Sequence, residues 1–196
     1  MLVVYALTSR DDLKEVLGIV DNSEDNLLDN IINRATDIIE SYCNGRRFKS
    51  TLYTEEKYDG NDGKYINARH YPITDVTKVE RNLGSVGDTD WDTLNDDFWA
   101  YIDDGSGPGQ FYYEFGFVRG ARNYRFTYTA GYTDIPYDLE EACLELCVWI
   151  YKDRQNKGLQ SETLGEYSYT KVSFTGNPIE ALGIDLILDK YRTPTI

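Results

Sequence analysis

The sequence predicts an α+β fold in which a helical core of about four helices carries an inserted antiparallel β-rich subdomain. Two observations lead to this prediction. Apolar residues recur at three- and four-residue steps in residues 7–45 and again after Ile135-Pro136, which is typical of helices. Between these segments, short runs of Tyr, Phe, Val, Ile and Thr are separated by Gly, Asn and Asp clusters, which is typical of a small antiparallel sheet. The expected parts are N-terminal core helices in 1–45, the β-rich subdomain in 46–132, a core helix in 133–158, and a linker or arm with a C-terminal helix in 159–196.

Two helices are expected before residue 45. Thr8 or Ser9 can cap a short first helix, which Gly18 ends. Ser23 then opens a longer helix with one apolar stripe, and Asn44-Gly45 provides its C-terminal stop.

The β-rich subdomain contains six candidate strands. The stretch from Arg125 to Thr129 has β-branched or aromatic residues at nearly every position, and Asp104-Gly105 and Pro108-Gly109 mark turns. The candidate strands are Tyr53–Tyr58, Tyr65–Ala68, Val76–Asn82, Phe98–Ile102, Phe111–Glu114 and Tyr124–Ala130.

Helical spacing returns in the last third of the chain. Asp138 is the expected cap of a helix that Gly158 ends, with acidic residues in its first turns and basic residues in its last. Asn177 precedes a proline and is expected to cap a final helix that runs to about Tyr191. A hairpin arm is predicted at 165–175.

The charge balance limits the function classes. The chain has 20 Lys and Arg against 34 Asp and Glu, a net charge of −14, so it lacks the broad basic face that sequence-specific DNA reading requires. One histidine, His70, makes His-based zinc sites and Ser-His-Asp chemistry hard to build. Three cysteines, an odd number, and a short apolar opening run predict a soluble protein that is made in the cytoplasm, with no membrane span.

Neither motif that could hold a metal is convincing. Asp59–Gly63 opens like a calcium loop, but the oxygen ligand, glycine and glutamate that an EF-hand needs further along are missing, so a tight turn is the favoured interpretation. Cys143 and Cys147 lie one helical turn apart in an apolar stripe without further ligands, which favours buried thiols. We therefore expect no metal, no cofactor and no catalytic residue.

Residues 83–118 contain eight acids and no Lys or Arg. They fit either a solvated loop or an electrostatic surface that repels phosphate when many copies surround a DNA strand. The candidates for such a channel surface are Asp88, Asp90, Asp92, Asp96 and Asp97. Two basic clusters fit either pairing with carboxylates, in the chain or on another subunit, or a phosphate site. The clusters are Arg46, Arg47 and Lys49, and Arg119, Arg122 and Arg125.

Four segments of the chain carry a family resemblance. They read LTSRDDLKEVLGI, ATDIIESYCNGRRF, YRFTYTAGYTDIPYDLEEACLELCVWIYKDRQNKG and SETLGEYSYTKV. Together they resemble the head–tail connector (head-completion adaptor) proteins of long-tailed bacteriophages. The β insertion, roughly 80 residues by the element boundaries expected above, is larger than in compact members of that family.

The resemblance implies a structural virion protein at the head–tail junction. Such a protein forms a ring beneath the portal, usually a dodecamer, that extends the DNA channel and receives the next connector, stopper or tail component. Its partners would be further copies of itself, the portal protein and that downstream component, while DNA passes without specific binding. Rings use head-to-tail contacts, which need two different complementary patches on each subunit.

Subunit contacts are expected at exposed aromatic and basic residues of the insertion, and the terminal helix is expected to dock on the portal or an adjacent subunit. In the monomer we expect Tyr112, Phe115 and Phe117 to be partly exposed. The candidate contact residues are Tyr112, Phe115, Phe117, Arg119, Arg122, Leu182, Ile184 and Tyr191. The many tyrosines of the insertion leave a glycan- or receptor-binding module of a phage tail as the alternative. The 34 acids contain many carboxylate pairs, which leaves a small glycoside hydrolase as a third, weaker alternative.

Overall fold

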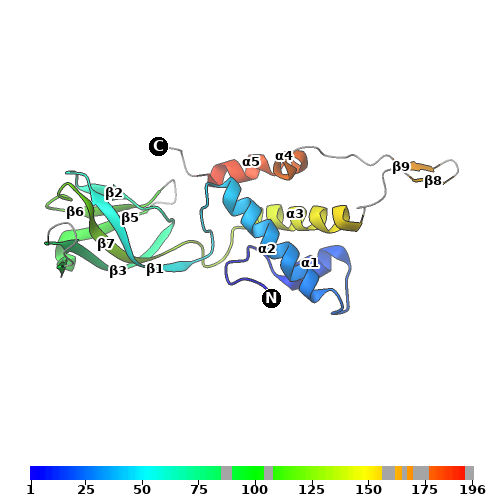
Figure 1. Cartoon of the computed structure of the whole chain (residues 1–196), viewed down its shortest axis with the longest axis horizontal. Helices are drawn as coiled ribbons and strands as arrows, with labels where there is room; N and C mark the ends of the chain where they lie inside the picture. The colour runs from blue at the N-terminus through cyan, green and yellow to red at the C-terminus, as the bar shows by residue number, and fades with distance from the viewer. Residues whose placement is uncertain (85–89, 104–107, 156–161, 165–166, 170–176, 193–196) are drawn as a thin grey trace. The chain divides into compact units, whose positions relative to one another are not determined.

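A computed structural model of the chain describes residues 1–84, 90–103, 108–155, 162–164, 167–169 and 177–192. It divides into two compact units, one formed by Met1–Arg46 with Ile135–Ile196 and the other by Arg47–Asp134. The first unit is helical and the second is built from antiparallel sheets (Figure 1). The predicted α+β fold class is therefore confirmed.

The first two helices of the helical unit are α1 (Arg10–Leu17) and α2 (Asp25–Tyr42). Ser9 caps α1 by accepting the amide hydrogen of Asp12, and Gly18 ends it in the left-handed conformation, as the sequence predicts. Ser23 was expected to open α2 but lies before its first turn. The Ser23 amide and hydroxyl both donate to Asp21 Oδ1, at 2.8 and 2.5 Å. The hydroxyl that was expected to cap the helix is therefore engaged by Asp21.

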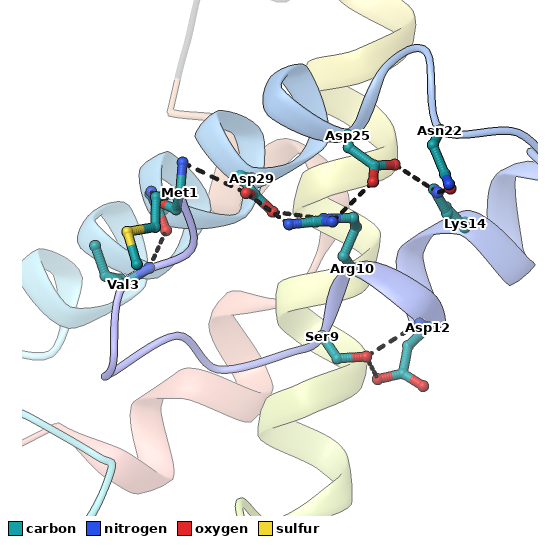
Figure 2. Close-up of polar contacts among 10 residues, drawn as sticks. Met1, Val3, Ser9, Arg10, Asp12, Lys14, Asn22, Asp25 and Asp29 are labelled. Atoms are coloured by element: carbon teal, nitrogen blue, oxygen red, sulfur yellow. Dashed lines mark hydrogen bonds and ion pairs between the residues drawn. The ribbon is translucent and has the colours of Figure 1, made fainter.

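An ion-pair cluster joins α1 to α2. Arg10 donates from Nε to Asp29 Oδ1 and from Nη1 to Asp25 Oδ2, both at 2.8 Å, and Lys14 Nζ lies 2.5 Å from Asp25 Oδ1 (Figure 2). The Asp29 side chain is only 1% exposed, so its charge needs these partners. The hydrogen bond from Arg10 outweighs burial and lowers the pKa of Asp29, so the pair stays ionised and holds α1 on α2.

The third helix, α3 (Tyr137–Gln155), packs against α2 and α1. Cys143 and Cys147 are buried and not disulfide-bonded, as expected. A hydrogen bond with Cys143, together with burial, raises the pKa of Cys147 and keeps this thiol protonated. Asp138 lies within the first turn of α3 and not before it. The Pro136 carbonyl accepts the first helical hydrogen bonds, and Asp138 Oδ1 accepts both the Leu139 amide at 3.0 Å and the Tyr191 hydroxyl at 2.6 Å.

The C-terminal part is not the single helix that the sequence predicts. Asn177 caps α4 (Pro178–Leu182) as expected, but Gly183, with φ of 72°, ends it after five residues. The chain resumes as α5 (Asp185–Leu188) and a 3-10 turn, η2 (Asp189–Tyr191). Strands β8 (Glu162–Leu164) and β9 (Tyr167–Tyr169) pair antiparallel. Gly158 and most of the predicted arm at 165–175 lie outside the described residues.

The β unit contains two antiparallel sheets, ordered β1-β7-β3-β4 and β2-β6-β5 (Figure 1). All six predicted strands are present, and the sequence reasoning missed one, β4, a short strand among acidic residues that pairs with the end of β3. The predicted turn at Asp104-Gly105 lies outside the described residues. The bounds are β1 (Thr51–Gly60), β2 (Tyr65–Asn67), β3 (Ile73–Asn82), β4 (Trp91–Thr93), β5 (Trp99–Ile102), β6 (Gln110–Tyr113) and β7 (Gly120–Ala130).

An aromatic core joins the two sheets. Phe111 of β6 stacks on Phe126 of β7 with ring centroids 4.1 Å apart, and Tyr58 of β1 meets both rings edge-on. The two ends of the insertion lie side by side, where Lys49 pairs with Tyr132 next to Gly131. A side chain at Gly131 would approach the Lys49 carbonyl oxygen to 2.7 Å, and the φ of 107° also requires glycine.

Candidate assembly surface

The outer face of the β2-β6-β5 sheet is uncharged. The strand register sets Tyr65, Tyr112 and Ala100 in one row across the three strands. Asn67, Gln110 and Ile102 form the next row on the same face, because residues two apart on a strand point to the same side. We call these six residues the uncharged face.

Most of the uncharged face is open to solvent. Tyr65 is 46% exposed and Ile102 is 48% exposed. The Tyr65 and Tyr112 rings lie 5.3 Å apart, and Gln110 Nε2 donates to Asn67 Oδ1 at 2.9 Å. Ordered, neighbouring aromatic and amide groups of this kind are typical of protein interfaces, where aromatic residues are enriched and charged residues are depleted.

An aromatic corner continues this surface. Phe115, which is 67% exposed, lies with its ring 5.0 Å from Phe98, and Tyr113 contacts Phe115 edge-on at 5.6 Å. A largely exposed phenylalanine that packs on other partly exposed rings leaves apolar area for a partner to cover.

Of the three aromatic residues that the sequence predicted to be partly exposed, Tyr112 and Phe115 are so, but Phe117 is not. Phe117 is 0% exposed and belongs to the core of the β unit, so its assignment to a subunit interface is wrong. Gly116, with φ of 79°, reverses the chain. The Phe117 amide then donates to the Gly63 carbonyl at 2.7 Å, and the Phe117 carbonyl accepts the Asp62 amide hydrogen at 2.8 Å. These two backbone hydrogen bonds hold Phe117 with its ring turned inward.

The outer face of the β1-β7-β3-β4 sheet is charged and internally paired. Arg125 of β7 donates from Nε and Nη2 to both oxygens of Glu80 on β3, at 2.7 and 2.8 Å. Lys78 lies 2.7 Å from the same carboxylate, and Glu55 lies 3.0 Å from Arg125. The hydrogen bond from Arg125 is the main cause that lowers the pKa of Glu80, so these charges already have partners within the chain. We call this the charged face.

Arg119 and Arg122 have exposed side chains at the start of β7. Their backbone amides donate to the carboxylates of Asp62 and Asp59, at 2.9 and 2.6 Å. The calcium-like motif at residues 59–63 therefore serves as a structural turn that fixes the neighbouring strand. Within the described residues no cluster of three or more His, Cys, Asp or Glu could hold a metal ion.

The acidic candidates for a channel surface are all exposed where the structure describes them. Asp90 and Asp92 lie at β4, whereas Asp96 and Asp97 lie on a separate 3-10 turn, η1 (Asp96–Phe98). Asp88 lies outside the described residues.

The three candidates in the C-terminal region differ in exposure. Ile184 is 1% exposed and is part of the core of the helical unit, so it has no surface for a partner, contrary to expectation. Leu182 is half-buried and borders an open groove with Val16, Leu144, Val148 and Trp149. Tyr191 is half-buried, with its hydroxyl bound to Asp138 and its carbonyl to Arg46.

These features define a class of protein. A helical unit carries an inserted β unit of two antiparallel sheets, and an exposed uncharged face with aromatic residues is typical of proteins that assemble with others. None of the helices in the described ranges has the length and apolar character that a membrane span requires.

The comparisons with known proteins agree with this class. The model of a family described as "Head completion protein" matches residues 6–193, so the chain belongs to the head completion protein family. The fold is similar to a chain in a structure described as the neck of an empty GTA particle computed with C6 symmetry, with a TM-score of 0.58 and 14% identity. That similarity covers 95% of this chain and 89% of the other. No curated protein sequence matches significantly. The family confirms the predicted head–tail connector role and places the protein in the virion, at the head–tail junction.

Proposed function

We propose that this chain is a non-enzymatic ring subunit, present in twelve copies beneath the portal, that extends the DNA channel and receives the next neck or tail component. The observation that carries this proposal is the uncharged face. In a chain with a net charge of −14, an exposed three-stranded sheet face without a charge indicates a surface that is covered in the assembly.

A ring of identical subunits requires heterologous contacts, in which one patch of each copy meets a different patch of the next. The uncharged face and the aromatic corner at Phe98 and Phe115 supply one such patch. The six-fold symmetry in the description of the neck structure supports a ring whose copy number is six or twelve. Twelve copies would match a dodecameric portal.

The acids at β4 support a channel role. Asp90 and Asp92 are exposed, and in a ring the repetition of such acids gives a surface that repels phosphate. DNA then slides, because the channel offers few cationic contacts that would hold it. Synthesis in the cytoplasm of a bacterial host and contact with the portal are parts of this proposal.

Cryo-electron microscopy of virions that carry this chain tests the proposal. The expected result is a closed ring next to the portal, with Tyr65, Tyr112 and Phe115 buried between neighbouring subunits. A location at the tail tip, or a single copy per particle, would contradict it. A glycan array with the purified protein checks the receptor-binding alternative, since a connector gives no specific binding there.

A further inference from the structure

A groove on the helical unit contains two arginines that have no ion pair with a carboxylate among the described residues. It is lined by Ile31 and Arg34 of α2 and by Trp149, Ile150, Asp153 and Arg154 of α3, and it encloses about 250 Å³. Pockets for small molecules usually measure about 300–1,000 Å³, so this groove suits a short turn of another protein chain. We call it the arginine groove.

Many basic side chains of this acidic protein are already paired. Arg10, Lys14, Lys78 and Arg125 each lie within 3.0 Å of a carboxylate. In the part of the chain that the structure describes, Arg34 and Arg154 have no such ion pair, although acids outnumber bases by 34 to 20.

The floor of the arginine groove is apolar. Ile31 and Ile150 are buried and Trp149 is half-buried. A ligand that fills the groove therefore has to combine negative charge with an apolar group. A bare phosphate chain would leave the apolar floor uncovered.

The β unit presents this combination at η1. Asp96 and Asp97 are exposed, and the next residue, Phe98, is 37% exposed. The turn is ordered by its own contacts: Asn95 Oδ1 accepts the Asp97 amide at 3.0 Å, and Trp99 Nε1 donates to Asp96 Oδ1 at 3.1 Å. The Asp96 carboxylate is thus held in place without being neutralised, and the backbone that carries Asp97 is fixed.

We propose that Arg34 and Arg154 of one copy bind Asp96 and Asp97 of a second copy, with Phe98 against Ile150 and Trp149. The inference rests on the proposed ring. It names one heterologous contact of that ring, in which a basic apolar groove meets an acidic aromatic turn. It also assigns Asp96 and Asp97 to the subunit contact and leaves Asp90 and Asp92 for the channel.

Charge exchange between two variants of the full chain tests the contact. One variant carries Arg34→Glu and Arg154→Glu, and the other carries Asp96→Lys and Asp97→Lys. Each alone should associate at least about tenfold more weakly than the wild type, because like charges then meet at the contact. An equimolar mixture should regain association, because the altered groove of one variant then meets the altered turn of the other with opposite charge.

The control variant carries Glu15→Lys and Asp75→Lys. These are two exposed acids, one in each unit, and their replacement changes the net charge by as much as the Asp96→Lys and Asp97→Lys variant does. Sedimentation velocity should show wild-type association for it, and circular dichroism should show that every variant folds. Variants that associate like the wild type, or a mixture without recovery, would overturn the contact.

A cross-link reads the contact even where association is weak. In an Arg34→Lys variant, carbodiimide should join the introduced lysine to Asp96 or Asp97. In a mixture of ¹⁴N- and ¹⁵N-labelled protein, mass spectrometry should find linked peptides of mixed isotope. Peptides of one isotope only, or none, would overturn the inference. The ring itself is judged separately by microscopy of virions, so a ring without this cross-link refutes only the contact.

Discussion

The two outward faces of the β unit differ in how they treat charge. On the charged face, Arg125, Glu80 and Lys78 satisfy one another within the chain. On the uncharged face, Tyr65 and Tyr112 lie side by side without any charge in their rows. The difference teaches that strands rich in aromatic residues can build two outward faces in one small unit, one with paired charges and one with none in its two rows of residues.

The largest expected effect is a loss of stability at Phe117, which lies in the core, with no such loss at Phe115, which lies two residues earlier at the surface. Phe117→Ala should lower the free energy of unfolding of the β unit by about 4 kcal/mol, because it leaves a cavity in the core. Phe115→Ala should leave stability unchanged and weaken association. Urea titration measures the first effect and sedimentation velocity the second. Equal stability losses in both variants would contradict the placement of Phe115 at the surface.

A charge placed on the uncharged face should break assembly. Tyr112→Asp should weaken association about a hundredfold, because the carboxylate would be buried without a partner. The matched control is Thr129→Asp, also on a central strand but on the side of the charged face, which should associate normally. If both variants assemble like the wild type, the uncharged face is not an interface.

On the charged face, loss of one partner should affect stability and not assembly. Arg125→Met leaves the buried Glu80 with only Lys78, and should cost about 2–3 kcal/mol of unfolding free energy. Adding Glu80→Met should recover most of the loss, because no unpaired buried charge remains. Fluorescence of Trp91 and Trp99 in a Trp149→Phe background follows the β unit in urea. Lost association in Arg125→Met would contradict the distinction between the two faces.

The smallest effect concerns acid. Burial raises the pKa of Glu56, but hydrogen bonds with His70, Tyr128 and Tyr58 outweigh it and hold the pKa at about 2. A lowered carboxyl pKa contributes fully above the unfolded value of 4.5 and loses its contribution as the pH falls towards 2. Between pH 7 and pH 3, Glu56 should account for about 2 kcal/mol of lost stability.

Glu56→Gln should remove that part of the pH dependence and leave the rest. Urea titrations at several pH values measure it, with Asp75→Asn, at an exposed acid of the same unit, as the control. A Glu56→Gln variant with the same acid slope as the wild type would show that Glu56 titrates normally in the folded protein.

Local signals predicted the elements better than their ends. The capping patterns at Ser9 and Asn177 and the aromatic runs of the strands are properties of neighbouring residues, and the structure uses them as expected. Ser23 does not cap α2 because its hydroxyl donates to Asp21, and Asp138 does not precede α3 because the helix already begins at Tyr137, with the Pro136 carbonyl accepting its first hydrogen bonds.

The candidate surface was only partly predictable. Tyr112 and Phe115 could be named from the sequence as aromatic residues of the insertion, but Tyr65 and Ile102 could not be grouped with Tyr112. Their common face follows from the pairing of β2 and β5 with β6, and a shift of one residue would turn them to the other side. The arginine groove was missed for the same reason, since Arg34 and Arg154 meet only where α2 packs on α3.

The sequence by itself determined the α+β class and the acidic charge balance, because composition and periodicity are carried by neighbouring residues, and the head–tail connector role came from the family resemblance of four segments. The tertiary structure alone decided that Phe117 lies inside while Phe115 lies outside, and which charges pair with which. Those outcomes depend on contacts between residues distant in the chain, and such contacts exist only once strand register and helix packing are fixed.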